Sequence, residues 1–97
     1  MMEIKFTPSA RSMFLDAILH IKKEDQQAAA RFKSKVEKGL IQLIEFPKSG
    51  KKMQEFPDLP FREVLIPPYR FFYRVKGETA WIVAVWHGAQ NPKRSTK

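Results

Sequence analysis

Two side chains that commonly handle phosphate groups, Arg70 and His87, stand at the outer ends of two consecutive strand-like runs, 70–76 and 79–87. If these runs pair through a tight hairpin, Arg70 and His87 become diagonal neighbours, roughly 7 to 8 Å apart and within reach of one phosphate. Arginine binds phosphate through its planar guanidinium, and histidine transfers protons near neutral pH. The spacing therefore predicts an anion-binding site, with the alternative that His87 merely ends a strand.

The same face of the predicted hairpin carries aromatic side chains between its cations. The turn Lys76-Gly77-Glu78-Thr79 has Gly at the first central position of a two-residue type II′ hairpin, which fixes the register. The predicted core face carries Phe71, Tyr73, Val75, Ala80, Ile82 and Ala84, and the opposite face Arg70, Phe72, Arg74, Trp81, Val83, Val85 and His87. Such a basic, aromatic face can bind nucleic acid by phosphate contacts and base stacking. The alternative is that Arg74 and Trp81 form a plain cation-π pair.

The residue types that are missing exclude several kinds of chemistry. The chain has no cysteine, so disulfides, thiolate catalysis and cysteine-ligated zinc are excluded. Its two histidines, His20 and His87, are too few for an obvious metal site, and we expect neither a metal nor a cofactor. No run approaches the ~20 apolar residues of a membrane span, and the N-terminus lacks the layout of a secretory signal. We therefore expect a cytoplasmic protein with no membrane partner.

The charge of the chain indicates an anionic partner. Lys and Arg number 18 against 10 Asp and Glu, which gives a formal net charge of +8. Residues 1–47 carry eight basic and six acidic side chains (+2), whereas residues 48–97 carry ten and four (+6). RNA, DNA or an acidic protein would suit the second half, and a generally basic, soluble surface is the alternative.

Hydrophobic periodicity predicts the elements that position these side chains. Residues 3–7 alternate as a short strand, and helices near 9–23 and 26–46 each carry one apolar stripe. The stripe of the first helix contains Ala10, Met13, Phe14, Ala17, Ile18 and Ile21, and that of the second Ala29, Phe32, Val36, Leu40, Leu43 and Ile44. Residues 47–60 contain three prolines and have no clean period, which predicts a long loop.

The order β-α-α-β-β-β implies an α+β fold, in which a curved antiparallel sheet carries a helical hairpin on one face. The last three strands are predicted at residues 61–66, 70–76 and 79–87, which are rich in β-branched and aromatic residues. The chain is 97 residues long, enough for one small core. We expect a single domain over residues 1–90 and a basic, flexible tail over 91–97.

Residues 61–90 resemble the C-terminal half of the RelE/ParE superfamily, the toxins of type II toxin-antitoxin systems that include the plasmid stabilization proteins. They read FREVLIPPYRFFYRVKGETAWIVAVWHGAQ, with a Tyr-Arg-x-x-Tyr-x-Val strand followed by a strand ending in Val-x-His-Gly. The Thr-Pro after the first strand, the Ala-Ala-x-x-Phe of the second helix and the Phe-Pro-x-x-Gly after it are also similar. The His-Gly-Ala that ends the last strand resembles the ParE-like branch more closely.

The resemblance implies a toxin held inactive by a cognate antitoxin, whose C-terminal segment wraps around it. ParE-like members are growth inhibitors that bind DNA gyrase and do no chemistry of their own, and this is the leading interpretation. The alternative is a RelE-like endoribonuclease, an mRNA interferase that cleaves mRNA in the ribosomal A site.

Under the nuclease alternative, the resemblance assigns Arg70 to the phosphate, His87 as general acid and Glu55, in the loop, as general base. The chain departs from the nuclease pattern because no tyrosine follows His87 to stack a base. The other expected nucleic-acid or target contacts are Arg62, Arg74, Trp81, Lys51 and Lys52.

Leu15 and Leu19 lie one helical turn apart and point well away from the buried stripe of the first helix. A small domain has little reason to expose such a pair, so we expect them to bind the antitoxin, whose other contacts should be acidic. The alternative is that residues 47–60 or the tail fold over them.

Overall fold

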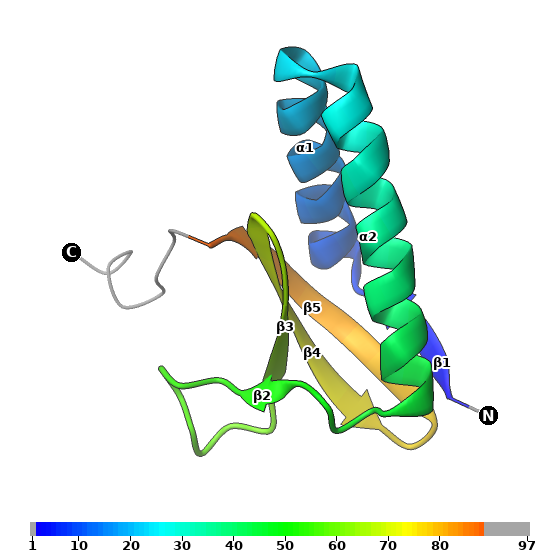
Figure 1. Ribbon diagram of the computed structural model, residues 1–97. Helices are drawn as coiled ribbons and strands as arrows, with labels where there is room; N and C mark the ends of the chain where they lie inside the picture. Colours follow the sequence, from blue (N-terminus) through cyan, green and yellow to red (C-terminus); the bar gives the residue numbers. More distant parts are fainter. Residues whose placement is uncertain (1, 89–97) are drawn as a thin grey trace.

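The protein consists of a helical hairpin that stands on one face of a curved five-stranded sheet (Figure 1). The computed structural model describes residues 2–88, so the predicted tail, 91–97, lies outside the described part. The elements are β1 (Glu3–Phe6), α1 (Pro8–Glu24), α2 (Gln26–Glu45), β2 (Lys51–Lys52), β3 (Arg62–Ile66), β4 (Tyr69–Lys76) and β5 (Thr79–His87). None of the helices within residues 2–88 has the length and apolar character to cross a membrane.

The sheet has the order β1-β5-β4-β3-β2, in which β1 runs parallel to β5 and the other neighbours are antiparallel. The predicted α+β class and element order are confirmed. The predicted antiparallel pairing holds for β2 to β5 but not for β1, because the helical hairpin carries the chain from β1 at one edge to β2 at the other, and β5 then returns beside β1 in the same direction.

Side-chain caps define both helices close to their predicted limits. The Thr7 hydroxyl accepts a hydrogen bond from the Ala10 amide at 3.1 Å, and Pro8 occupies the first turn of α1. One carboxylate oxygen of Asp25 accepts from the amides of Gln27 and Ala28, at 2.9 and 3.2 Å. Asp25 therefore separates α1 from α2 with a single extended residue, which makes the hairpin tight.

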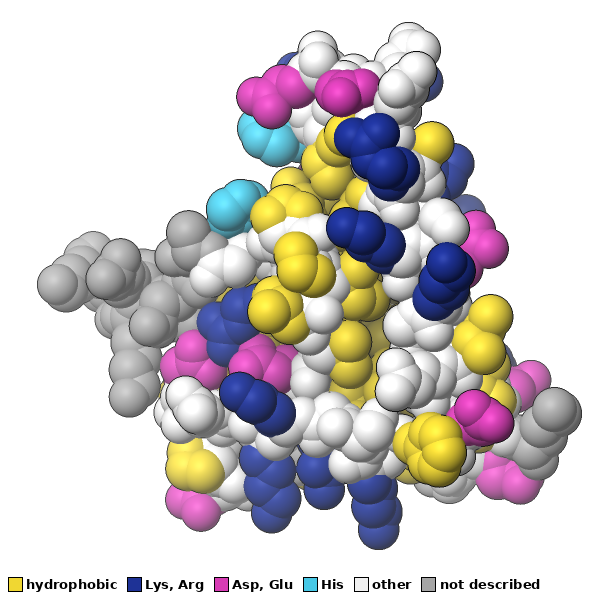
Figure 2. Space-filling view, viewed as in Figure 1, with side chains coloured by type: hydrophobic (Ala, Val, Ile, Leu, Met, Phe, Trp, Pro, Cys, Tyr) yellow, Lys and Arg dark blue, Asp and Glu magenta, His cyan; other side chains and the backbone are white. Residues whose placement is uncertain are grey.

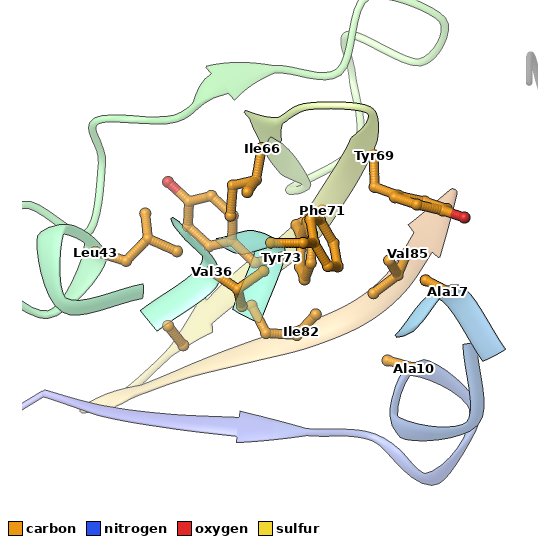
Figure 3. Packing of buried hydrophobic residues seen from close by; sticks show 12 residues of the cluster. Ala10, Ala17, Val36, Leu43, Ile66, Tyr69, Phe71, Tyr73, Ile82 and Val85 are labelled. Atoms are coloured by element: carbon orange, nitrogen blue, oxygen red, sulfur yellow. The ribbon is translucent and has the colours of Figure 1, made fainter. Parts of the chain in front are cut away.

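The core lies between the helical hairpin and the inner face of the sheet, and Figure 3 shows its side chains facing one another from both layers. Phe14 joins the layers, with its ring centroid 5.5 Å from that of Phe6 and 5.9 Å from that of Phe71. Ala10 and Ala80 are fully buried, and their small side chains let helix and sheet approach closely. The predicted stripe of α1 packs on this core as expected, and so does that of α2 except for Ala29, which is buried outside the cluster, and Ile44, which is only partly buried.

The β4–β5 hairpin follows the predicted register only next to its turn. Gly77 has φ 60°, and no described non-glycine residue has a positive φ, as a type II′ turn requires. Lys76 pairs with Thr79 and Tyr73 with Ile82, but a bulge at Val83 then pairs Phe72 with Ala84. Because the extra residue lies on β5, it shifts every later side chain of β5 to the other face, so the predicted faces are wrong for residues 84–87, whereas the predicted faces of β4 hold.

Two residues show the effect of this bulge. Val85, which was expected on the open face, is buried in the core at 4% exposure, whereas Ala84 shares the face of Arg70. His87 pairs with Tyr69 and lies on the helical side of the sheet. The predicted neighbourhood of Arg70 and His87 is therefore wrong.

The segment 47–60 is more ordered than the predicted loop, because Lys51–Lys52 pair with β3. The Tyr73 hydroxyl donates to the Pro47 carbonyl at 2.8 Å and accepts from the Gly50 amide at 2.9 Å. A Cβ atom at position 50 would lie 2.5 Å from that hydroxyl, so only glycine fits. Burial raises the pKa of Tyr73, although the Gly50 hydrogen bond and the Arg62 charge oppose the shift. The neutral phenol therefore holds the segment against the sheet.

Candidate functional site

Arg70 lies in a partly buried ion cluster on the face of the sheet away from the helices. Its Nε donates to Glu63 at 2.8 Å, and its Nη2 lies 2.7 Å from Glu63 and 3.0 Å from Glu55. The three side chains are only 12–15% exposed, and the guanidinium lies 4.9 Å from the centroid of the Phe72 ring. Two carboxylates against one guanidinium give the cluster a formal charge of −1.

The charge state of Arg70 follows from these contacts. Burial by itself lowers the pKa of the guanidinium, but the hydrogen bonds and charges of Glu63 and Glu55 outweigh it and raise the pKa above its ordinary value. Arg70 is thus a permanent cation whose charge is already balanced within the protein. An incoming phosphate would have to displace a carboxylate or lie beside one.

The elements bring this cluster together from three parts of the chain. Glu63 pairs with Phe72, and Leu65 with Arg70, so Glu63 and Arg70 are diagonal neighbours across β3 and β4. Glu55 follows β2, in a turn where the Met53 amide donates to the Phe61 carbonyl at 3.2 Å. The sequence named Arg70 and Glu55 but missed Glu63. The sequence did offer one signal: Glu63 lies on the preceding strand, two residues before Leu65, the residue that pairs with Arg70.

His87 occupies a different site, on the helical side at the end of the sheet. Its ring centroid lies 5.4 Å from that of Tyr69, with the rings at 76°. Both residues, together with His20 of α1, line two open cavities of about 370 and 570 Å³. Figure 2 shows the histidine side chains, in cyan, on one side of the molecule where the helical hairpin rises above the sheet. Burial raises the pKa of Tyr69, which keeps its phenol neutral at ordinary pH. The sequence did not single out Tyr69 or give His20 a role.

Of the five other predicted contacts, Arg74 and Trp81 lie together on the open face. They pair directly across β4 and β5, and Lys5 Nζ of β1 lies 5.8 Å from the centroid of the Trp81 ring. Arg62, by contrast, pairs with the buried Tyr73 and donates to the Gly50 carbonyl at 2.8 Å. Lys51 and Lys52 are both exposed in β2. Arg62 thus supports the fold of the 47–60 segment.

Leu15 and Leu19 are 50% and 56% exposed on the outer side of α1. Their exposure matches the prediction, and the 47–60 segment does not cover them. Within residues 2–88, no group of three or more histidine, aspartate or glutamate side chains could hold a metal ion.

Comparisons with known proteins agree with this architecture. The model of a family described as "ParE toxin of type II toxin-antitoxin system, parDE" matches residues 4–92. A solved structure described as "Chromosomal ParDE TA system from P. aeruginosa" superposes with a TM-score of 0.69. The likeness covers 90% of this chain and 96% of that chain at 20% sequence identity, and thus concerns the fold. No curated protein matches the sequence.

Proposed function

The chain belongs to the ParE toxin family of type II toxin-antitoxin systems, and from this membership we propose that it inhibits growth by binding DNA gyrase and is neutralised by a cognate antitoxin. The observation that carries the binding mode is the separation of Arg70 from His87. Arg70 faces away from the helices, whereas His87 packs against Tyr69 on their side. Because Arg70 and His87 do not face one another, they do not form a catalytic pair, and a toxin that acts by binding needs none.

The nuclease alternative requires a different arrangement of the same residues. Cleavage of RNA needs a cation and a proton donor that converge on one phosphate. The Arg70 guanidinium instead lies against Glu55 and Glu63, whose negative charges repel a phosphate. One observation favours the alternative, namely that Arg70 and Glu55 are in contact, as a phosphate ligand and a general base would be. RNA cleavage is therefore kept as the opposing outcome of the experiment below.

The antitoxin contact is proposed at the outer side of α1. Leu15 and Leu19 lie one turn apart on this helix and are half exposed. An amphipathic antitoxin segment could cover them with its apolar side while its acidic residues meet the basic second half of the chain. A cognate antitoxin would thus combine a local apolar contact with a general electrostatic attraction.

Expression of the chain in bacteria, with two readouts scored separately, tests the proposed target. We expect a DNA-damage (SOS) response and filamentation before any loss of protein synthesis, because a poisoned gyrase leaves broken DNA. Purified chain should also inhibit supercoiling by purified gyrase, and co-expressed antitoxin should abolish both effects. Immediate translation arrest, with transcripts cut in the ribosomal A site and gyrase unaffected, would replace the proposal with the nuclease alternative.

A further inference from the structure

Trp81 lies between two cations in a row that crosses three strands of the open sheet face. Lys5 of β1 pairs with Trp81 on one side, and Arg74 of β4 pairs with it on the other. All three side chains point away from the helices, because Ala80 and Ile82, the neighbours of Trp81 along β5, are fully buried on the inner face. Adjacent strands lie about 4.8 Å apart, so the two cations flank the indole directly.

The row is accessible, and cations predominate around it. The Lys5 side chain is 53% exposed, Arg74 is exposed, and Trp81 is partly exposed. Lys5 Nζ stands over the indole, 5.8 Å from the ring centroid, so this half-exposed lysine would swing aside to a phosphate when a base stacks on the partly exposed ring. Lys76 lies on the same face beyond Arg74. Acidic side chains on this face include Glu3, 3.9 Å from Lys5, and the Glu55 and Glu63 that bind Arg70.

We propose that this row binds single-stranded nucleic acid, with a base stacked on Trp81 and phosphates held by Lys5 and Arg74. A flat aromatic ring between two cations matches the alternation of bases and phosphates along a single strand. An acidic protein segment would use the two cations but offers the indole a planar ring only where it carries an aromatic side chain, whereas every nucleotide carries one. A duplex hides its base faces, so the exposed ring favours a single strand. The inference does not depend on gyrase being the target of the chain.

Binding of a short fluorescein-labelled oligothymidylate, followed by anisotropy at several salt concentrations, tests this site. Replacing the indole in Trp81→Leu should weaken binding about tenfold, because stacking of one base is lost, whereas Trp81→Phe should keep most of it. Lys5→Ala and Arg74→Ala should each lower the salt dependence, log K against log salt, by about 0.7. Lys23→Ala, at the exposed end of α1, removes the same charge at a distant place and should change neither value.

A second readout reports directly on the ring. The chain has two tryptophans, so Trp86→Phe leaves Trp81 as the single indole, and its emission should be quenched by unlabelled oligothymidylate. Absence of quenching, an equal loss in Lys23→Ala, or displacement by polyglutamate as effective as by oligothymidylate would overturn the proposal. Inhibition of gyrase by the unsubstituted chain is scored separately. If that chain inhibits gyrase but does not bind oligothymidylate, this site alone is rejected, and if it binds oligothymidylate but does not inhibit gyrase, the proposed target alone is rejected.

Discussion

Arg70 is held by two carboxylates before any ligand arrives, so its removal would leave Glu55 and Glu63 close together in a site only 12–15% exposed. We expect Arg70→Met to destabilise the fold by about 3 kcal/mol in urea unfolding at neutral pH, because two partly buried like charges then repel each other without the guanidinium between them. The exposed Arg74 offers a matched control, and Arg74→Met should change stability by less than about 0.5 kcal/mol.

A rescue experiment separates this explanation from simple loss of packing. Arg70→Met combined with Glu55→Gln and Glu63→Gln removes all three charges and should recover most of the lost stability. A triple variant as unstable as Arg70→Met alone would show that the charges are not the cause. A loss of toxicity in Arg70→Met therefore indicates a direct role of Arg70 only if the variant is still folded under the conditions of the toxicity assay.

His87 distinguishes the two classes of target, because glutamine keeps a polar side chain of similar size but cannot donate a proton as a general acid. If the chain acts by binding, His87→Gln loses one contact, about 1 kcal/mol or roughly fivefold in affinity, and should remain toxic at high expression. A nuclease would lose ~10²- to 10⁴-fold in rate. The measurement is growth inhibition by His87→Gln protein that is soluble and still binds the antitoxin. If expression of this variant does not inhibit growth, the proposal that the toxin acts by binding is contradicted.

At the scale of elements, the sequence predicted what depends on local rules and missed what depends on pairing between distant segments. Both helices follow from apolar stripes and from Asp25, and the hairpin turn follows from Gly77. The bulge at Val83 has no such signature, because Val83-Ala84-Val85 presents an apolar residue to the core in either register. Packing of Val85 into the core decides between them.

The unpredicted bulge at Val83 also explains which part of the candidate site was predicted correctly. Arg74 and Trp81 lie between the turn and the bulge, so their pairing was correct. Arg70 and His87 lie beyond the bulge, and their predicted contact was wrong. Glu63 depends on the pairing of β3 with β4, for which the sequence offered no turn signal as clear as Gly77.

Helix α1 carries the proposed antitoxin contact, and two substitutions on it test that role. Leu15→Asp with Leu19→Asp should abolish neutralisation in co-expression while the isolated toxin stays folded, because both side chains are already half exposed. Ile41→Asp on α2, where the side chain is 61% exposed, provides a matched control and should leave neutralisation intact. Unchanged neutralisation by the α1 double variant would reject the proposed strip.

At the scale of the whole molecule, the net positive charge and the exposed leucines of α1 are expected to affect different steps of antitoxin binding. The formal net charge is +8, and among the described residues Figure 2 shows basic side chains both along α2 and below the sheet. Such a field accelerates the approach of an acidic partner from many directions, whereas the exposed leucines act only after contact. Charge should therefore govern how fast the antitoxin binds, and the apolar contact how long it stays.

This division predicts how the kinetics of the antitoxin complex respond to salt. The association rate constant should fall at least tenfold between low and physiological ionic strength, because salt screens charges over about 8 to 10 Å, while the dissociation rate constant changes little. Leu15→Asp with Leu19→Asp should mainly raise the dissociation rate, since short-range contacts act in the formed complex. Stopped-flow mixing of toxin and antitoxin measures both constants. An association rate that is insensitive to salt would mean that the positive charge of the chain serves another partner, such as the nucleic acid proposed for the row of Lys5, Trp81 and Arg74.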